Sequence, residues 1–431
     1  MSKFQIITIS IFVICIIAGI AAFALYKGDS STTTLPSITI WGTFSKDSFD
    51  QYVSNINNTL QQQISIKYVE EPATSFTSDF VSALARGQGP DAILIPAELL
   101  LPNEDKLALI PFSSLSQRTL LDTYVKEAGL YVNQSGILGL PFMMDPLVMY
   151  WNRDMLDSAG IARAPQYWDD FTPINKALTV KDQNGNVRRS AIALGVFGNV
   201  DNAREILGTL LMQSGNPVTK LTPEGSIVST IKTSASVSPT AALQFFTKFV
   251  DPTNPDYSWN RSLPSSKAAF LSGSLATYFG FASELGDLKD KNPNLNFDIS
   301  MLPQVRTGGV KTTYGRMYGF SMVRTSQNLN TVFSVINTLT TTQPLADLSN
   351  KLYLPSVRRD VIAAGSNDPY ISLFNQAALV SNTWLDADIN RSYQIFGNMV
   401  YSLTSGQKTI YQAIQDAGDQ YDIVLGQAVS Q

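Results

Sequence analysis

The segment that most constrains the fold is the apolar run from Gly139 to Asn152, which holds two prolines and one carboxylate. Two prolines would break a helix here, and a surface loop would not be this apolar. Pro141 and Pro146 therefore bracket a short extended piece, and Leu147 to Trp151 is predicted to be a buried strand. We interpret the run as a crossing between two compact bodies, with Asp145 at the hinge.

The bulk composition limits what the chain can do. Its 431 residues exceed the size of a single core, which predicts two domains, and its net charge of −4 argues against nucleic-acid binding. Histidine is absent and Cys15 is the only cysteine, so histidine-based and thiolate-based catalysis and the metal sites built on these residues are excluded. The inventory favours a binding protein without catalytic residues, metal site or cofactor.

The N-terminus is predicted to be a membrane anchor. Phe4 to Tyr26 is almost uninterruptedly apolar, long enough for a helix to span a bilayer. Residues 1–27 are interpreted as a single-pass anchor and residues 28–36 as a Ser/Thr-rich tether. This arrangement places the body at the cell membrane, outside the cytoplasm. The alternative is a signal peptide cleaved after Ala22–Ala24, which would release a secreted protein.

The first part of the body alternates strands and helices, as in a parallel sheet covered by helices. In such sheets, ligands bind at the loops that follow the carboxyl ends of strands. Two such loops are 41–43, with Trp41 and Thr43, and 96–98, with Glu98. The predicted elements are strands at 37–41, 64–69 and 90–95, and helices at 46–62 and 75–86.

The later part adds two more candidate crossings, at 319–323 and 351–359. A glycine-spaced loop is expected at 307–318, before the first of them. The remaining predicted elements are strands at 276–279 and 297–302 and helices at 153–159, 267–275, 392–403 and 409–425.

A set of short motifs carries a resemblance to a known family. They are Gly89–Asp91 before a strand, Leu140–Asn152, Asp182–Gly195 around an Asn-Gly turn, Phe270–Gly273 with Ala276–Gly280, Leu302–Pro303, Leu354–Pro355 and Ser405–Gly406. In this order they resemble the extracellular solute-binding proteins of ABC transporters, in particular the carbohydrate-binding group. The resemblance covers residues 37 to 431.

The resemblance implies an α/β periplasmic-binding-protein fold of type II. Each of two lobes would be a mainly parallel sheet flanked by helices, and a three-segment hinge would join them. Carried over, lobe I is 37–143 with 319–353, and lobe II is 146–316 with 356–431. A receptor of this kind captures a carbohydrate by hinge closure and delivers it to the permease of an ABC importer.

The site residues follow from what a sugar needs, namely acids, amides and arginine for its hydroxyls and aromatic rings for its apolar faces. Glu98 and Asp145 match acids of the family. Aromatic side chains surround Gly280, and Arg316 with Tyr318 breaks a pattern of small residues beside a crossing. The candidate ligand contacts are Trp41, Thr43, Glu98, Asp145, Tyr278, Phe279, Gly280, Phe281, Arg316, Tyr318, Trp384 and Tyr393.

Each candidate has a competing structural interpretation. Glu98 could be a solvated loop acid, Asp145 could hold the hinge by hydrogen bonds, the aromatic side chains could pack in the core, and Arg316 could bridge the lobes through an acid. Two other functions also stay open. One is a receptor of the same fold for a peptide, polyamine or phosphate ester, and the other is a glycoside hydrolase that uses Glu98 and Asp145 as a carboxylate pair.

Overall fold

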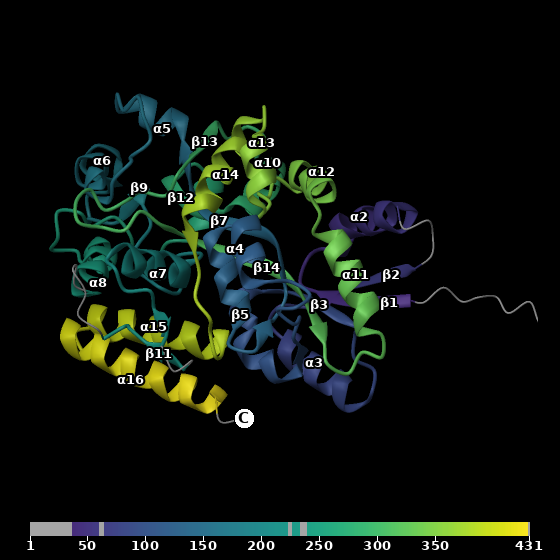
Figure 1. Ribbon diagram of the computed structural model, residues 1–431. Coiled ribbons are helices and arrows are strands. Elements are labelled where there is room, and N and C mark those ends of the chain that lie inside the picture. Colours follow the sequence, from purple (N-terminus) through teal and green to yellow (C-terminus); the bar gives the residue numbers. More distant parts are fainter. Residues whose placement is uncertain (1–36, 60–63, 223–225, 233–238, 430–431) are drawn as a thin grey trace, which may run out of the picture.

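One 11-stranded sheet runs through the whole molecule, with helices packed around it (Figure 1). The computed structural model describes residues 37–59, 64–222, 226–232 and 239–429. The strand order along the sheet is β2-β1-β3-β14-β7-β12-β9-β8, with β4, β13 and β15 attached beside it. We call the side with β2, β1 and β3 the first half and the side with β12, β9, β8 and β13 the second half; β14 and β7 lie between them.

The first half is a parallel sheet, as predicted. The strands β1 (Ser37–Gly42), β2 (Ser65–Glu70) and β3 (Ala92–Pro96) pair in parallel, and every residue of β3 is buried. Its helices include α2 (Lys46–Thr59), α3 (Phe76–Ala85), α11 (Leu329–Leu339) and α12 (Thr342–Leu352). The apolar sequence of β3 explains its central place, because a strand with both faces covered needs no polar alternation.

Two long strands carry the chain between the halves. β7 (Leu140–Asn152) pairs antiparallel with β14 (Thr313–Val323), and all of β7 except Trp151 is buried. A third segment lies beside them, because the Met144 N–H donates to the Pro355 carbonyl at 2.9 Å. The apolar run is thus one continuous strand through the middle of the molecule, where the sequence predicted a crossing.

The loop expected at 307–318 is wrong from Thr313 onward, where β14 begins. Glycine occupies these positions of the strand because neighbouring atoms leave no room for a Cβ. A Cβ at Gly315 would lie 2.5 Å from the Ser381 side chain, and one at Gly319 would lie 2.4 Å from the Tyr131 hydroxyl oxygen. In this strand, glycine marks a close approach of neighbouring chain and not a flexible loop.

The second half departs from the expected mainly parallel sheet. β12 (Leu275–Phe281) is parallel to β9 (Val187–Ile192), but β7 is antiparallel to β12 and to β13 (Phe297–Ser300), and β8 (Val180–Lys181) is antiparallel to β9. The expectation is wrong here because β7 enters from the first half. It runs away from the centre while β12 runs toward it.

Three helices of the second half come close to the first half. They are α7 (Ala203–Gln213), α15 (Ile389–Thr404) and α16 (Ile410–Val429), and α15 and α16 lie side by side (Figure 1). The other elements are α4 (Gln117–Thr123), α5 (Arg153–Ser158), α6 (Phe171–Leu178), α8 (Pro239–Thr247), α9 (Ser266–Leu271), α10 (Leu285–Lys291), α13 (Arg359–Ala364), α14 (Pro369–Val380), β4 (Leu107–Ala108), β5 (Val132–Asn133), β6 (Gly136–Ile137), β10 (Thr219–Leu221), β11 (Ile227–Ser229) and β15 (Ser381–Asn382).

The expected anchor and tether, residues 1–27 and 28–36, lie outside the described residues. Within the described part of the chain, no helix is both long enough and apolar enough to cross a bilayer. The residue limits of the two lobes stay a prediction.

Candidate ligand-binding cleft

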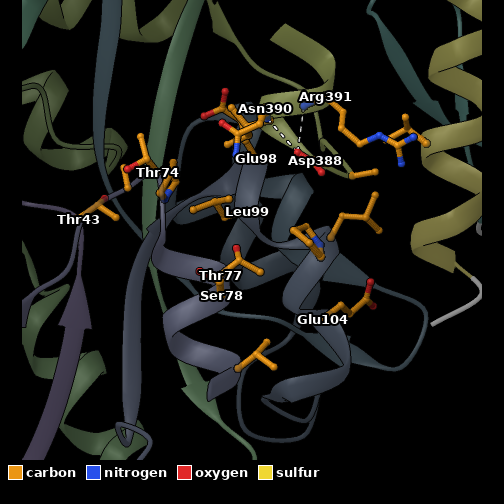
Figure 2. A pocket seen from close by; sticks show the side chains of 18 of the residues that line it. Thr43, Thr74, Thr77, Ser78, Glu98, Leu99, Glu104, Asp388, Asn390 and Arg391 are labelled. Carbon is orange, nitrogen blue, oxygen red and sulfur yellow. Dashed lines mark hydrogen bonds between the residues drawn. The ribbon is translucent and has the colours of Figure 1, made fainter. Parts of the chain in front are cut away.

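A cleft of about 1400 Å³ lies between the two halves. Its first wall comes from α3, the end of β3 and the turns that follow it, and its second wall from α7, β11, the start of α15 and the end of α16. Figure 2 shows Thr74, Thr77 and Ser78 on one wall and Asp388 and Arg391 on the other. The position agrees with the rule that ligands meet the carboxyl ends of strands.

The lining of the cleft combines polar and apolar side chains, with charges of both signs. Among the described residues that line it, Tyr318 supplies the only aromatic ring. Such a surface offers many directional hydrogen bonds and suits a polar solute. The charged side chains are Glu98, Glu104, Asp105, Lys106, Arg204, Glu205, Arg316, Asp388 and Arg391, and the hydroxyl side chains are Thr43, Thr74, Thr77, Ser78, Ser82 and Ser226.

Glu98 stands at the carboxyl end of β3. The strand ends at Pro96, and a 3₁₀ turn at Ala97–Leu99 sets the Glu98 side chain toward the second half. Its Oε1 atom accepts a hydrogen bond from Arg204 Nη1 at 3.2 Å and another from the Tyr314 hydroxyl. Glu98 is only 3% exposed, so its charge depends on these partners.

Arg204 is the cation opposite Glu98. It lies on α7, is 1% exposed, and also pairs with Asp386 and with Glu205, the latter at 3.0 Å. Its guanidinium lies 4.6 Å from the centre of the Trp384 ring. Burial alone would lower the pKa of Arg204, but the surrounding carboxylates raise it well above its usual value, so the guanidinium is a fixed positive charge.

Arg316 and Tyr318 enter the cleft from β14. They are two residues apart on the strand and therefore project from the same face. The Arg316 guanidinium lies 4.2 Å from the centre of the Phe281 ring, and its Nε is 3.9 Å from Glu98 Oε2. The Tyr318 ring packs edge-on against Phe44 at 4.5 Å. Both residues line the cleft, where the Arg316 guanidinium also hydrogen-bonds the Tyr318 hydroxyl.

Asp145 takes the structural role that competed with ligand binding. Its carboxylate accepts hydrogen bonds from the Ser283 N–H at 3.0 Å and from the Ser283 hydroxyl at 2.7 Å. The side chain is 2% exposed and does not line the cleft. Burial raises the pKa of Asp145 to about 6, although Arg316 nearby acts in the opposite direction.

The aromatic side chains expected over the cleft lie elsewhere. Tyr278, Phe279 and Phe281 are at most 3% exposed, so their expected placement is wrong. The reason is that β12 is an interior strand with both faces covered. At Gly280, a Cβ would lie 2.5 Å from the Tyr278 ring. Trp384 is also buried, beneath Arg204.

Two other candidates lie outside the cleft lining. Trp41 is partly buried and packs against the core. Tyr393 on α15 is 47% exposed, and its ring packs edge-on against Phe197 at 4.7 Å. Of the predicted contacts, the structure therefore brings Thr43, Glu98, Arg316 and Tyr318 together around the cleft.

Sequence reasoning missed Arg204 and its partner Asp386. A signal was present for Arg204, because it precedes the apolar run Ile206–Met212 in a helix that is buried on nearly every side. An arginine in such a helix requires a buried anion. The polar start of α15, Asp388 to Arg391, was also missed. Its signal was an aspartate immediately before an amphipathic helix, which caps the first turn.

The sequence matches a known family over most of its length. The model of the bacterial extracellular solute-binding proteins matches residues 51–372. The chain belongs to this family. It is therefore a solute-binding receptor of the kind that serves ABC importers, and its body lies outside the cytoplasm. No curated protein sequence matches the chain.

Several solved structures share the fold. The GacH receptor of Streptomyces glaucescens, solved unliganded and with acarbose, has 16% identity and a TM-score of 0.70 over 91% of this chain and 98% of its own. The maltotriose-binding protein of Thermus thermophilus has 16% identity and a TM-score of 0.66, covering 90% and 100%. The cyclic α-maltosyl-1,6-maltose-binding protein of Arthrobacter globiformis has 15% identity and a TM-score of 0.72, covering 91% and 100%. At these identities, the likeness establishes a two-lobed α/β architecture.

Proposed function

We propose that the cleft captures a carbohydrate, that the halves close on it, and that the loaded receptor delivers it to the permease of an ABC importer. The observation that carries the proposal is the lining of the cleft, where hydroxyls, carboxylates and guanidinium groups come from both halves. A solute bound there touches both walls only when they are together, so binding favours the closed arrangement. The structural relatives bind acarbose, maltotriose and cyclic α-maltosyl-1,6-maltose, which supports a saccharide as the solute.

The contacts we propose are Thr43 and Glu98 from the first half and Arg316 and Tyr318 from β14. Carboxylate and guanidinium groups exchange strong hydrogen bonds with hydroxyls, and the Tyr318 ring can cover one apolar sugar face. Tyr393 stays a predicted contact at the edge of the second wall. The lobe limits proposed from the sequence place these residues on both sides of the hinge.

The proposed activity is binding without bond cleavage. A glycoside hydrolase needs two carboxyl groups about 5–10 Å apart that flank the substrate. Of the pair nominated for this role, Glu98 lines the cleft, while Asp145 is buried against Ser283 outside it. Incubation with maltotriose or chromogenic glycosides should therefore release no product.

Thermal unfolding of the full chain against a panel of ligands tests the function. The panel contains neutral and charged oligosaccharides, peptides, polyamines and phosphate esters. A ligand at 100 times its dissociation constant should add about 2.7 kcal/mol of stability. Glu98→Gln should abolish the shift, and the matched variant Asp145→Asn, outside the cleft, should keep it. A shift only with non-saccharides would contradict the proposal that the solute is a carbohydrate.

We also propose that residues 1–27 anchor the receptor in the cell membrane by a single helix. The support is the almost uninterruptedly apolar sequence of Phe4 to Tyr26. The intact mass of the protein recovered from its native membrane tests this, because cleavage after Ala24 would remove residues 1–24, nearly all of the apolar segment, and give a secreted receptor.

A further inference from the structure

The two oxygens of the Glu98 carboxylate have different surroundings. Oε1 accepts hydrogen bonds from Arg204 on α7 of the second half and from Tyr314 on β14, which lies between the halves. Oε2 accepts no hydrogen bond from the described residues and forms an ion pair with Arg316, whose Nε is 3.9 Å away. Glu98 and Arg316 both border the cleft.

Arg204 is fixed by contacts that do not involve Glu98. Its Nε donates to the Ser392 hydroxyl at 3.0 Å, and its Nη2 pairs with Asp386. Asp386 is fully buried and accepts a second hydrogen bond from the same Ser392 hydroxyl. With the Trp384 ring beneath it, the guanidinium has a set position and plane before any ligand arrives.

The contact between Arg204 and Glu98 joins the two halves across the cleft. Glu98 follows β3 of the first half, and Arg204 lies on α7 of the second half. Separation of the walls would break this ion pair and leave each charged group without this partner. Attraction between the two charges therefore favours the closed arrangement even without a ligand.

The geometry points to Arg204 as the positioning residue of the cleft. It clamps Glu98 through Oε1 when the halves meet, so that Oε2 and the Arg316 guanidinium together receive a ligand hydroxyl. One hydroxyl can donate to the carboxylate oxygen and accept from the guanidinium, because the two groups form an ion pair whose 3.9 Å separation is too long for a hydrogen bond between them. This inference rests on the proposed function, since it assigns the arrangement that recognises the solute.

Electrostatics explain why an arginine is needed at this place. A buried carboxylate is costly unless a cation pairs with it, and Arg204 supplies both that charge and a hydrogen bond that fixes Oε1. Without Arg204, the Glu98 carboxylate loses this positioning contact, so ligand binding should weaken. A lysine at this place keeps the charge and should recover part of the loss.

The first test needs no ligand and uses the full chain. Spin labels are placed on cysteines that replace the exposed residues Ala85 on α3 and Ile423 on α16, with Cys15→Ser as background. Arg204→Met should lengthen the mean distance between the labels, and Arg204→Lys should restore part of the difference. The control Arg306→Met removes an exposed arginine and its pairs with Asp169 and Asp170, and it should leave the distance unchanged.

The second test titrates the parent protein and its variants with maltotriose as the probe. Arg204→Met should bind at least about tenfold more weakly than the parent, as expected for one lost charge-assisted hydrogen bond, and Arg204→Lys should recover part of the affinity. Glu98→Gln should also bind weakly. A purely structural role of Arg204 would lower the stability of Arg204→Met and leave the affinity of the folded protein unchanged.

The outcomes separate the inference from the proposed function. An unchanged label distance in Arg204→Met overturns the role of Arg204, whatever the sugar result. A lengthened distance with an affinity for maltotriose equal to that of the parent also overturns it. If the parent protein binds neither maltotriose nor any saccharide of the panel, the proposed function fails, and the label distance still decides whether Arg204 holds the walls together.

Discussion

Glu98 and Asp145 are two buried carboxylates that the sequence assigned to the same kind of role. Their exposed fractions are 3% and 2%, but their partners differ. Glu98 faces the guanidinium of Arg204, while Asp145 accepts hydrogen bonds from Ser283 alone. An ion pair offsets the cost of burying Glu98, whereas Asp145 has only neutral hydrogen-bond donors, and burial raises the pKa of Asp145 to about 6 although Arg316 nearby acts in the opposite direction. The cleft thus holds an ion-paired acid, and the hinge holds an acid with a raised pKa.

The largest effect should come from removing the cation of the cleft. Arg204→Met leaves Glu98 and Asp386 buried without their partner and should lower the free energy of unfolding by about 3–5 kcal/mol. Urea unfolding measures the loss. The exposed arginine variant Arg306→Met should lose at most about 1 kcal/mol. Equal losses in the two variants would show that the burial of the Arg204 pairs adds nothing.

The hinge acid should make stability depend on pH. Because the pKa of Asp145 rises from 3.8 to about 6 on folding, its contribution is fully present below about pH 4 and is lost as the pH rises through about 6. The loss should reach about 3 kcal/mol, since each pKa unit is worth about 1.4 kcal/mol. Melting temperatures of the parent and Asp145→Asn, measured from pH 4 to 8, check this, and parallel curves would contradict it.

Removing a neutral hydrogen-bond donor should affect stability differently at the two acids. Tyr314→Phe removes a hydroxyl donor from the ion-paired Glu98 and should cost about 1.5–3 kcal/mol. Ser283→Ala should cost a similar amount above pH 6 but only about 0.5–1.5 kcal/mol below it, where Asp145 is protonated. Unfolding at pH 5 and pH 8 separates them. A pH-independent cost for Ser283→Ala would contradict the difference expected between the acid of the cleft and the acid of the hinge.

The smallest effect should come from an exposed ion pair. Arg118 and Asp122 lie one turn apart on α4 with side chains 91% and 72% exposed. Arg118→Ala should change the free energy of unfolding by less than about 0.5 kcal/mol, because water screens both charges. A loss comparable to that of Arg204→Met would mean that burial is not what separates the pairs.

Local sequence explains which predicted contacts line the cleft. Glu98 lies there because it follows a strand whose apolar sequence places it in a parallel sheet, where the carboxyl ends of strands form the binding edge. The aromatic cluster around Gly280 was misplaced because the sequence pattern of an aromatic strand is the same whether the strand faces a cleft or the core. Only the neighbours of β12 on both faces decide between the two.

The sequence by itself determined the alternation of strands and helices in the first half, the crossing at Gly139–Asn152 and the family, because each depends on local pattern or on short motifs in order. The tertiary structure decided the direction of pairing in the second half, the place of Asp145 and the partnership of Glu98 with Arg204. The last pair is separated by 106 positions. Such contacts follow from packing in three dimensions, where a buried charge must find its partner wherever the chain brings one.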